Sequence, residues 1–101
     1  MDKTFQYQFE WDTTKARQNA RRHRVTFERA ATVFLDSNAL SLFDTEHSQH
    51  EERWITLGLD RTGTLLVVCH TYRDETETSA RIRIISARRA TKNEAKQYER
   101  K

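Results

Sequence analysis

The chain has 101 residues and a net charge of +3, with 33% charged and 36% hydrophobic residues, so we expect residues 1–101 to form a single domain around a small core. One cysteine, two glycines and no proline exclude a disulfide scaffold, a thiolate metal cluster and a glycine-rich phosphate loop. No apolar run approaches the ~20 residues of a membrane span and no signal peptide is recognised, so we expect a cytoplasmic protein with no membrane partner.

The first part of the chain predicts one strand followed by two helices. Residues 5–9 alternate apolar and polar side chains, which is typical of a short strand. Asp12 is a suitable N-cap for a helix that ends near residue 22, and Thr26 can cap a second helix. The second helix carries a buried stripe at helical spacing, made by Phe27, Ala30, Ala31 and Phe34.

The middle of the chain predicts strands joined by turns. Residues 39–43 predict an edge strand, and a polar loop separates them from the next strand at 53–59. An Asp-Arg-Thr-Gly hairpin connection leads to residues 65–69, which are apolar on both faces and therefore predict a central strand. A polar connection at 74–79 precedes a last strand at 81–87.

A capping box begins the last helix, with Thr91 at the N-cap and Glu94 three residues later. Ala95 and Tyr98 would face inward from this helix. Helices and strands fall in separate runs with short links, which favours an α+β fold. We predict two N-terminal helices, a mainly antiparallel sheet of about four strands and a C-terminal helix.

The predicted last strand gives the strongest indication of function. Successive side chains of a strand point to opposite faces, so Arg81 and Arg83 share one face while Ile82 and Ile84 share the other. Basic residues are concentrated here, since residues 81–101 hold eight Lys or Arg and two Glu. A face that presents guanidinium groups is suited to a polyanion, and RNA is the simplest candidate.

The predicted central strand ends in three chemically versatile residues, His70, Tyr72 and Arg73. A hairpin would bring them next to Arg81 and Arg83, combining a proton-transfer group with several phosphate clamps, which is what cleavage of RNA requires. Arginine suits the clamp because its planar fork contacts two phosphate oxygens and stays charged. In the alternative interpretation, His70 is a satisfied strand histidine and the arginines pair with the acidic residues between the two strands.

Further candidates lie on the first and last helices. Lys15, Asn19 and His23 form one line down the first helix and could face the same anion; alternatively, Asn19 and His23 brace the following turn. Tyr98 could stack on a base or relay a proton, or it could anchor the core. Two histidines three residues apart in the acidic loop lack a remote partner cluster, so we predict no metal site and no cofactor.

Together these motifs resemble the BrnT family of small bacterial toxins over nearly the whole chain. The residues that carry the resemblance are Phe9 to Asp12, Lys15, Ala16, Asn19, His23 and Val25 to Glu28; then Asp44, His47, Ser48, Glu52 and Arg53; then His70 to Arg73, Arg83 to Arg88, Ala90, Thr91, Glu94 and Tyr98. One position departs from the family: Arg24 stands where the family usually has glycine, which would supply a left-handed helix terminator.

The resemblance implies a fold similar to RelE-type ribonucleases and a metal-independent endoribonuclease that arrests growth by cutting RNA. It also implies a cognate antitoxin of BrnA type, whose ribbon-helix-helix region binds DNA, so the toxin would contact DNA only through the antitoxin. Under this hypothesis the candidate catalytic residues are His70, Arg73, Arg81, Arg83, Arg88 and Tyr98. The candidate RNA-binding residues are Lys15, Asn19, His23, Tyr72 and Arg89.

Two other functions use the same basic face. A non-catalytic nucleic-acid binder would show salt-sensitive binding and no RNA product, because each neutralised phosphate releases counterions. A protein-interaction module, whose arginines pair with an acidic segment of a partner, would show no affinity for RNA even at low salt.

Overall fold

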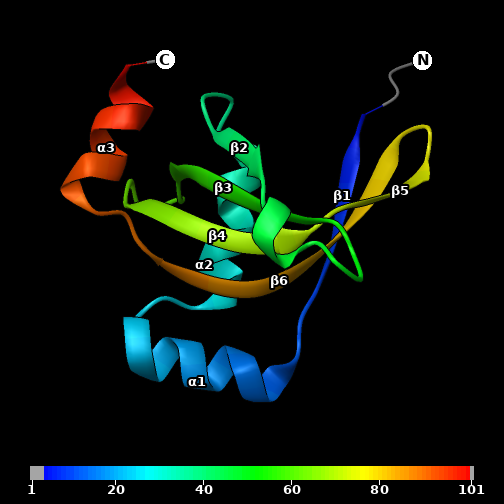
Figure 1. Ribbon diagram of the computed structural model, residues 1–101, viewed down its shortest axis with the longest axis horizontal. Helices are drawn as coiled ribbons and strands as arrows, with labels where there is room; N and C mark the ends of the chain where they lie inside the picture. The colour runs from blue at the N-terminus through cyan, green and yellow to red at the C-terminus, as the bar shows by residue number, and fades with distance from the viewer. Residues whose placement is uncertain (1–3, 101) are drawn as a thin grey trace.

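The computed structural model describes residues 4–100, which contain three α-helices, two short 3₁₀ helices and a six-stranded sheet (Figure 1). In chain order the elements are β1 (Gln6–Glu10), α1 (Thr13–His23), α2 (Phe27–Thr32), η1 (Val33–Leu35), β2 (Leu40–Phe43), η2 (Thr45–His47), β3 (Arg53–Leu59), β4 (Leu65–Thr71), β5 (Arg73–Thr76), β6 (Ser79–Arg89) and α3 (Lys92–Glu99). The predicted α+β class and its three helices are confirmed.

The sheet is mixed and has six strands, so the expectation of a mainly antiparallel sheet of about four strands is wrong in its strand count. Its order is β1-β6-β4-β3-β2, with β5 also paired to β6. The pairing of β1 with β6 is parallel, whereas the other pairs are antiparallel. Strand β5 occupies part of the expected polar connection. All four of its residues are exposed, so no alternation of apolar side chains marks it in the sequence.

The predicted helix caps are confirmed. The Asp12 carboxylate accepts hydrogen bonds from the backbone N–H groups of Thr14 at 2.8 Å and Lys15 at 3.0 Å. The Thr26 hydroxyl accepts one from the backbone N–H of Arg29 at 3.1 Å. The capping box at the start of α3 is formed in both directions. These bonds satisfy N–H groups that lack partners in the first turn of a helix.

The core lies between one face of the sheet and the segment formed by α2 and η1 (Figure 1). The fully or nearly fully buried side chains of this cluster are Val25, Phe27, Ala30, Val33, Leu66, Val68, Ile82, Ile84 and Ala87. Gly58 permits the close approach of η1, because a Cβ atom at this position would lie 2.8 Å from a Val33 methyl carbon. Apolar burial on this face is the main force that holds the sheet and α2 together.

Strand β6 carries the predicted alternation, and a bulge then reverses it. Ile82 and Ile84 are buried at 0% and 2% exposure, which leaves Arg81 and Arg83 on the opposite face, as predicted. Between the pairs that β4 makes with Ile84 and Ser86, the register shifts by one residue. An extra residue in one strand turns the side chains after it to the other face, so Ala87 joins the buried cluster.

Helix α1 covers the edge of β6 beyond the end of β1. The Asn19 side-chain amide donates to the carbonyl oxygens of Val25 at 3.0 Å and Ala87 at 2.8 Å, and its oxygen accepts from the Ala87 N–H at 3.1 Å. Asn19 therefore replaces the strand partner that β6 lacks at this point. Arg24 caps the C-terminal end of the helix with a left-handed φ of 59°, a conformation that glycine adopts without steric cost.

Candidate functional site

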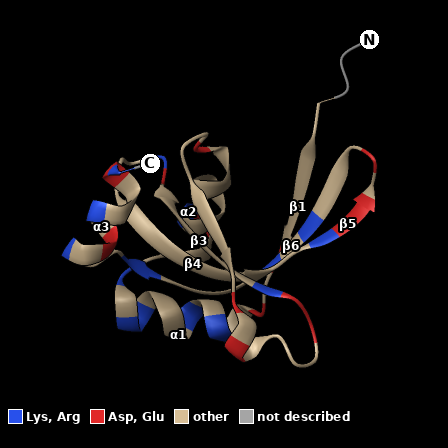
Figure 2. Cartoon of the chain, turned by 45° about the horizontal axis from the view of Figure 1, so that its top comes forward, with Lys and Arg blue, Asp and Glu red and all other residues tan. Residues whose placement is uncertain are grey.

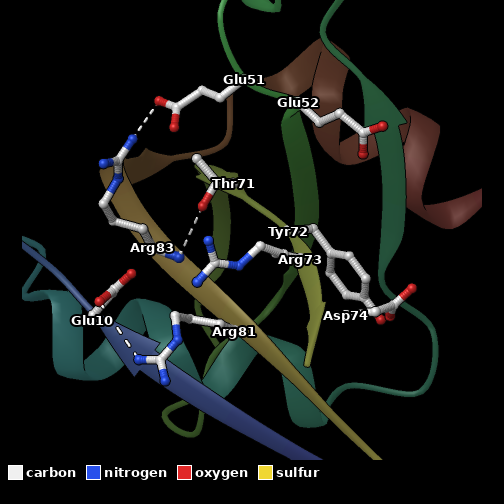
Figure 3. Close-up of a pocket in the computed structure, with 9 residues that line it drawn as sticks. All are labelled: Glu10, Glu51, Glu52, Thr71, Tyr72, Arg73, Asp74, Arg81 and Arg83. Atoms are coloured by element: carbon white, nitrogen blue, oxygen red, sulfur yellow. Dashed lines mark hydrogen bonds and ion pairs between the residues drawn. The ribbon is translucent and has the colours of Figure 1, made fainter. Parts of the chain in front are cut away.

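An open groove of about 460 Å³ brings three arginines together where β1, β5 and β6 meet (Figure 3). We call it the arginine groove. Its lining residues are Glu10, Glu51, Glu52, Thr71, Tyr72, Arg73, Asp74, Arg81 and Arg83. Of the predicted cleft residues, the groove thus contains Tyr72 and the three arginines, while His70 does not line it.

Strand pairing explains why these side chains meet. Arg81 and Arg83 lie two residues apart on β6 and therefore share a face. Arg73 lies opposite Arg81 in the antiparallel β5–β6 pair, and Glu10 lies opposite Arg83 in the parallel β1–β6 pair. The groove is thus built on paired strands, with Glu51 and Glu52 added from the loop that precedes β3.

Every arginine of the groove has a carboxylate partner. Arg83 binds Glu51, and Arg81 binds Glu75 and also lies 3.6 Å from Glu10. The hydrogen bond with Glu75 raises the pKa of Arg81. Arg73 is held least, since its guanidinium is 4.0 Å from Glu75 and its side chain is 72% exposed. The groove lining contains three arginines and four carboxylates, so the groove as it stands has a formal charge of −1.

These ion pairs can exchange for other anions. The side chains of Arg83 and Glu51 are 43% and 40% exposed, and the Arg81 side chain is 34% exposed. Solvent screens such exposed pairs, so they contribute little to stability. A phosphodiester group offers the same two-oxygen contact and the same single negative charge as a carboxylate, and it can therefore compete for the same guanidinium groups.

His70 lies on the other face of the sheet, in a separate cavity that we call the aromatic pocket. This cavity measures about 230 Å³ and is lined by Tyr7, Phe34, Ser41, Trp54, His70 and Tyr72. His70 is 3% exposed, and its ring nitrogens contact the Thr56 hydroxyl at 2.6 Å and the Thr71 carbonyl at 2.9 Å. Burial lowers the pKa of His70, so the ring is neutral and satisfied, as the alternative interpretation held.

Two other catalytic candidates brace helix α3. The Tyr98 hydroxyl donates to the Asp36 carboxylate at 2.6 Å, and this bond raises the pKa of Tyr98 to about 12. Arg88 makes two hydrogen bonds to Glu94, at 2.8 and 3.0 Å. Neither residue lines the arginine groove. Arg89, a candidate for RNA binding, follows Arg88 at the exposed end of β6.

The three residues of the predicted line along α1, Lys15, Asn19 and His23, border one groove of about 280 Å³ together with Arg22 of the same helix. This groove is separate from the arginine groove. Asn19 is 7% exposed and its amide is occupied by the backbone bonds described above, so it braces the fold, in agreement with the alternative interpretation. Figure 2 shows basic segments on α1 and α3 as well as on the strands of the arginine groove, so positive charge is not confined to that groove.

Sequence reasoning missed the carboxylates of the groove. Glu10 lies in the groove because β1 runs parallel to β6, which the pattern of the short strand did not reveal. The sequence pattern places Glu51 and Glu52 in a polar loop, whereas Asp74 belongs to the acidic residues that the alternative interpretation pairs with the arginines. The five carboxylates of residues 36–52, without any Lys or Arg, are typical of a solvated loop or a partner surface, and they do not by themselves indicate which basic residues lie beside them.

Within residues 4–100, no helix is long and apolar enough to cross a membrane. Among the same residues, no group of three or more His, Cys, Asp or Glu side chains is arranged to hold a metal ion.

Comparison with known proteins agrees on one family. Residues 11–94 match the family model for the ribonuclease toxin BrnT of type II toxin–antitoxin systems. The fold is similar to the crystal structure of the Brucella abortus ribonuclease toxin BrnT, with a TM-score of 0.59 and 16% sequence identity, covering 86% of this chain and 100% of that one. No curated protein sequence matches the chain.

Proposed function

The chain belongs to the BrnT family of ribonuclease toxins of type II toxin–antitoxin systems, and from this premise we propose that it is an endoribonuclease that cleaves RNA in the arginine groove. The observation that carries the proposal is the convergence of Arg73, Arg81 and Arg83 on one groove. Three guanidinium groups can grip a phosphodiester and stabilise the charge that grows on it during cleavage.

We propose a cleavage that needs no metal ion. A base removes the proton of the ribose 2′-hydroxyl, the resulting oxygen attacks the adjacent phosphorus, and an acid protonates the departing 5′-oxygen. The products are a 2′,3′-cyclic phosphate and a 5′-hydroxyl. The proton-transfer groups that line the groove are the carboxylates of Glu10, Glu51, Glu52 and Asp74 and the Tyr72 phenol. Burial raises the pKa of Tyr72.

This assignment changes the roles of three candidates. His70 has both ring nitrogens occupied and lies outside the groove, so we propose that it positions β3 against β4. Tyr98 and Arg88 are held by Asp36 and Glu94, and we propose that they secure α3. Arg73, Arg81 and Arg83 keep the clamp role, and Lys15, His23 and Arg89 remain candidates for contacts with more distant phosphates.

The family implies a protein antitoxin as partner. We propose that the partner is a BrnA-type antitoxin, which would cover the toxin and bind DNA through a ribbon-helix-helix region. We further propose that the toxin acts as a single domain in the cytoplasm and arrests growth. We also propose that the fold is related to that of RelE-type ribonucleases.

The test is incubation of purified protein with RNA, with and without EDTA, followed by gel electrophoresis and analysis of the product ends. We expect cleavage in both conditions and a cyclic phosphate end. Arg83→Ala should reduce the rate by about 10²-fold, the order of one lost charge-stabilising donor, whereas Arg61→Ala, in the exposed β3–β4 hairpin, should not. Binding without product would favour the non-catalytic binder, no affinity at low salt would favour the interaction module, and cleavage that EDTA abolishes would contradict the mechanism.

A further inference from the structure

Arg53, at the start of β3, is a fourth arginine on the face of the sheet that carries the arginine groove. It lies directly opposite Thr71 in the antiparallel β3–β4 pair, and residues in such a position share a face. Thr71 lines the groove, and its hydroxyl accepts a hydrogen bond from the Arg83 backbone N–H at 3.2 Å. Arg53 does not line the groove itself. Its side chain therefore leaves the sheet beside the groove, one strand further from β6 than Thr71.

One oxygen atom of Glu51 connects Arg53 with the groove. The Glu51 Oε1 that binds the Arg83 Nη2 (Figure 3) also lies 3.6 Å from the Arg53 Nη2. The two guanidinium groups thus converge on the same oxygen, although β4 separates their strands. Their side chains are similarly exposed, at 37% for Arg53 and 43% for Arg83. The Glu51 carboxylate therefore marks a point where two positive charges meet.

Arg53 is poorly satisfied by this contact. The distance of 3.6 Å exceeds the roughly 2.7–3.2 Å of an N–H···O hydrogen bond. Among residues 4–100 the Arg53 side chain makes no hydrogen bond, and its Nε is buried without a partner. The neighbouring Asp44, whose N–H donates to the Arg53 carbonyl at 2.8 Å, has its carboxylate 2.9 Å from the His47 ring. The guanidinium fork of Arg53 therefore has donors left for a further acceptor.

We propose that Arg53 is a further RNA-binding residue, and that Arg53 and Arg83 together hold one phosphodiester group in the place that the Glu51 carboxylate occupies. A phosphodiester has two non-bridging oxygens, so each guanidinium can bind one, whereas Glu51 meets both with a single oxygen. Glu51 lies in the loop before β3 and is 40% exposed, so it can turn away without disturbing the paired strands. The inference rests on the proposed function for the identity of the anion.

This exchange also changes the charge of the groove. With Glu51 in place, the lining has a formal charge of −1. Once Glu51 turns away and Arg53 joins, four arginines face only the carboxylates of Glu10, Glu52 and Asp74, which gives a formal charge of +1. Positive side chains then extend across the sheet from β5 through β6 to β3. The groove becomes attractive to an RNA strand at the moment when the strand replaces Glu51.

The test measures the affinity of the full chain for a short single-stranded RNA that carries 2′-O-methyl groups and cannot be cleaved, by fluorescence anisotropy at several salt concentrations. A side chain that neutralises phosphate charge on a single strand contributes about 0.7 to the slope of log K against log salt. Arg53→Ala should weaken binding about tenfold at low salt and make the slope shallower by about 0.7. Arg61→Ala, in the exposed hairpin at the other end of β3, should change neither.

Three further variants separate a direct contact from a structural role. Arg53→Lys should keep the slope, because the charge remains, and lose part of the affinity, because an ammonium lacks the planar fork. Arg53→Gln keeps a polar side chain and should show the same shallower slope as Arg53→Ala, so the test does not depend on the folding of the alanine variant. Glu51→Gln should bind more tightly than the wild type, and this gain should fall below about twofold in the double variant with Arg53→Ala, because only Arg83 is then freed.

Two results would overturn the inference: a wild-type slope in Arg53→Ala and Arg53→Gln, or an undiminished gain from Glu51→Gln in the double variant. Loss of binding to a polyglutamate peptide with unaltered RNA binding would assign Arg53 to an acidic protein partner and would also contradict it. Arg83→Ala and a cleavage assay of the wild type separate this failure from that of the proposed function. Cleavage with a slope that depends on Arg83 alone removes only Arg53, and a slope that depends on Arg53 without cleavage removes only the nuclease.

Discussion

The Glu51 carboxylate binds the Arg83 guanidinium, so an acidic side chain of the β2–β3 loop occupies the place that the proposed mechanism gives to a phosphate. Glu51 belongs to a connecting segment, whereas Arg83 belongs to the paired part of β6. The acidic partner is therefore the one that can move when RNA arrives.

Glu51→Gln is expected to bind RNA severalfold more tightly, because it removes one negative charge from the groove and frees Arg83. The measurement is fluorescence anisotropy with an RNA that carries 2′-O-methyl groups and cannot be cleaved. Glu46→Gln, the same change at an exposed position of the same loop, is the control. If Glu51 is also the base, the variant will bind more tightly and cleave more slowly. Weaker binding by Glu51→Gln would contradict competition between Glu51 and phosphate.

Asn19→Ala is expected to lower the free energy of unfolding by at least about 3 kcal/mol. It leaves buried backbone groups of Val25 and Ala87 without partners, and each such group costs about 1–3 kcal/mol. Denaturant unfolding measures the loss. Gln18→Ala, at the exposed neighbouring position of α1, should stay within about 0.5 kcal/mol of the wild type. An equal effect of the two changes would show that Asn19 does not support the edge of β6.

Arg24→Gly is expected to stabilise the protein by up to about 1 kcal/mol. A left-handed residue with a side chain costs about 1–2 kcal/mol, part of which the greater chain entropy of unfolded glycine offsets. The matched change Arg22→Gly, within α1, should instead destabilise by about 1 kcal/mol. Thermal unfolding of both variants provides the comparison, and a destabilised Arg24→Gly would mean that contacts of the arginine outweigh the backbone strain.

Asp60 is expected to make stability sensitive to acid. Burial alone would raise its pKa, but hydrogen bonds from Thr62, Thr64 and Arg29 lower it from 3.8 to about 2. Because the pKa of Asp60 is lower in the folded than in the unfolded protein, its ionised carboxylate stabilises the fold. This stabilisation is complete above the pKa of the unfolded state and disappears as the pH falls through the pKa of the folded state. The contribution, on the order of 2 kcal/mol, should therefore be lost between about pH 4 and pH 2.

The measurement for Asp60 is the pH dependence of the unfolding free energy for the wild type and Asp60→Asn. The variant should be less stable at neutral pH and should lose less stability over the acidic window. Parallel curves for the two proteins would contradict the assignment. Glu51→Gln serves as the control, since Glu51 is exposed and its change should leave the slope nearly unaltered.

Local patterns in the sequence were enough to predict the helices and the alternation along β6. Caps act within one turn, so Asp12 and Thr26 indicated helix starts without knowledge of the rest of the chain. Strand pairing is not local. The parallel partner of β6 is β1, at the other end of the chain, and the fully exposed β5 has no apolar pattern to reveal it.

The candidate site was predicted in part, and the limit has a physical cause. Arg73, Arg81 and Arg83 meet as expected because simple alternation and a hairpin position them. His70 was separated from them by the same alternation, since a residue facing the core cannot also face a groove on the other side. The bulge after Ile84 could not be read from the sequence, because one unpaired residue leaves no compositional mark.

The placement of Arg81 and Arg83 on β6 also affects the timing of activity during synthesis. Their strand is the last one translated, and it pairs with the first one, β1. A ribosome that stops before β6 would release a product lacking both arginines, and a chain with unpaired β6 would have no assembled groove. Under the proposed function, premature termination thus yields inert fragments, and a newborn toxin becomes harmful only when its final strand has joined the sheet.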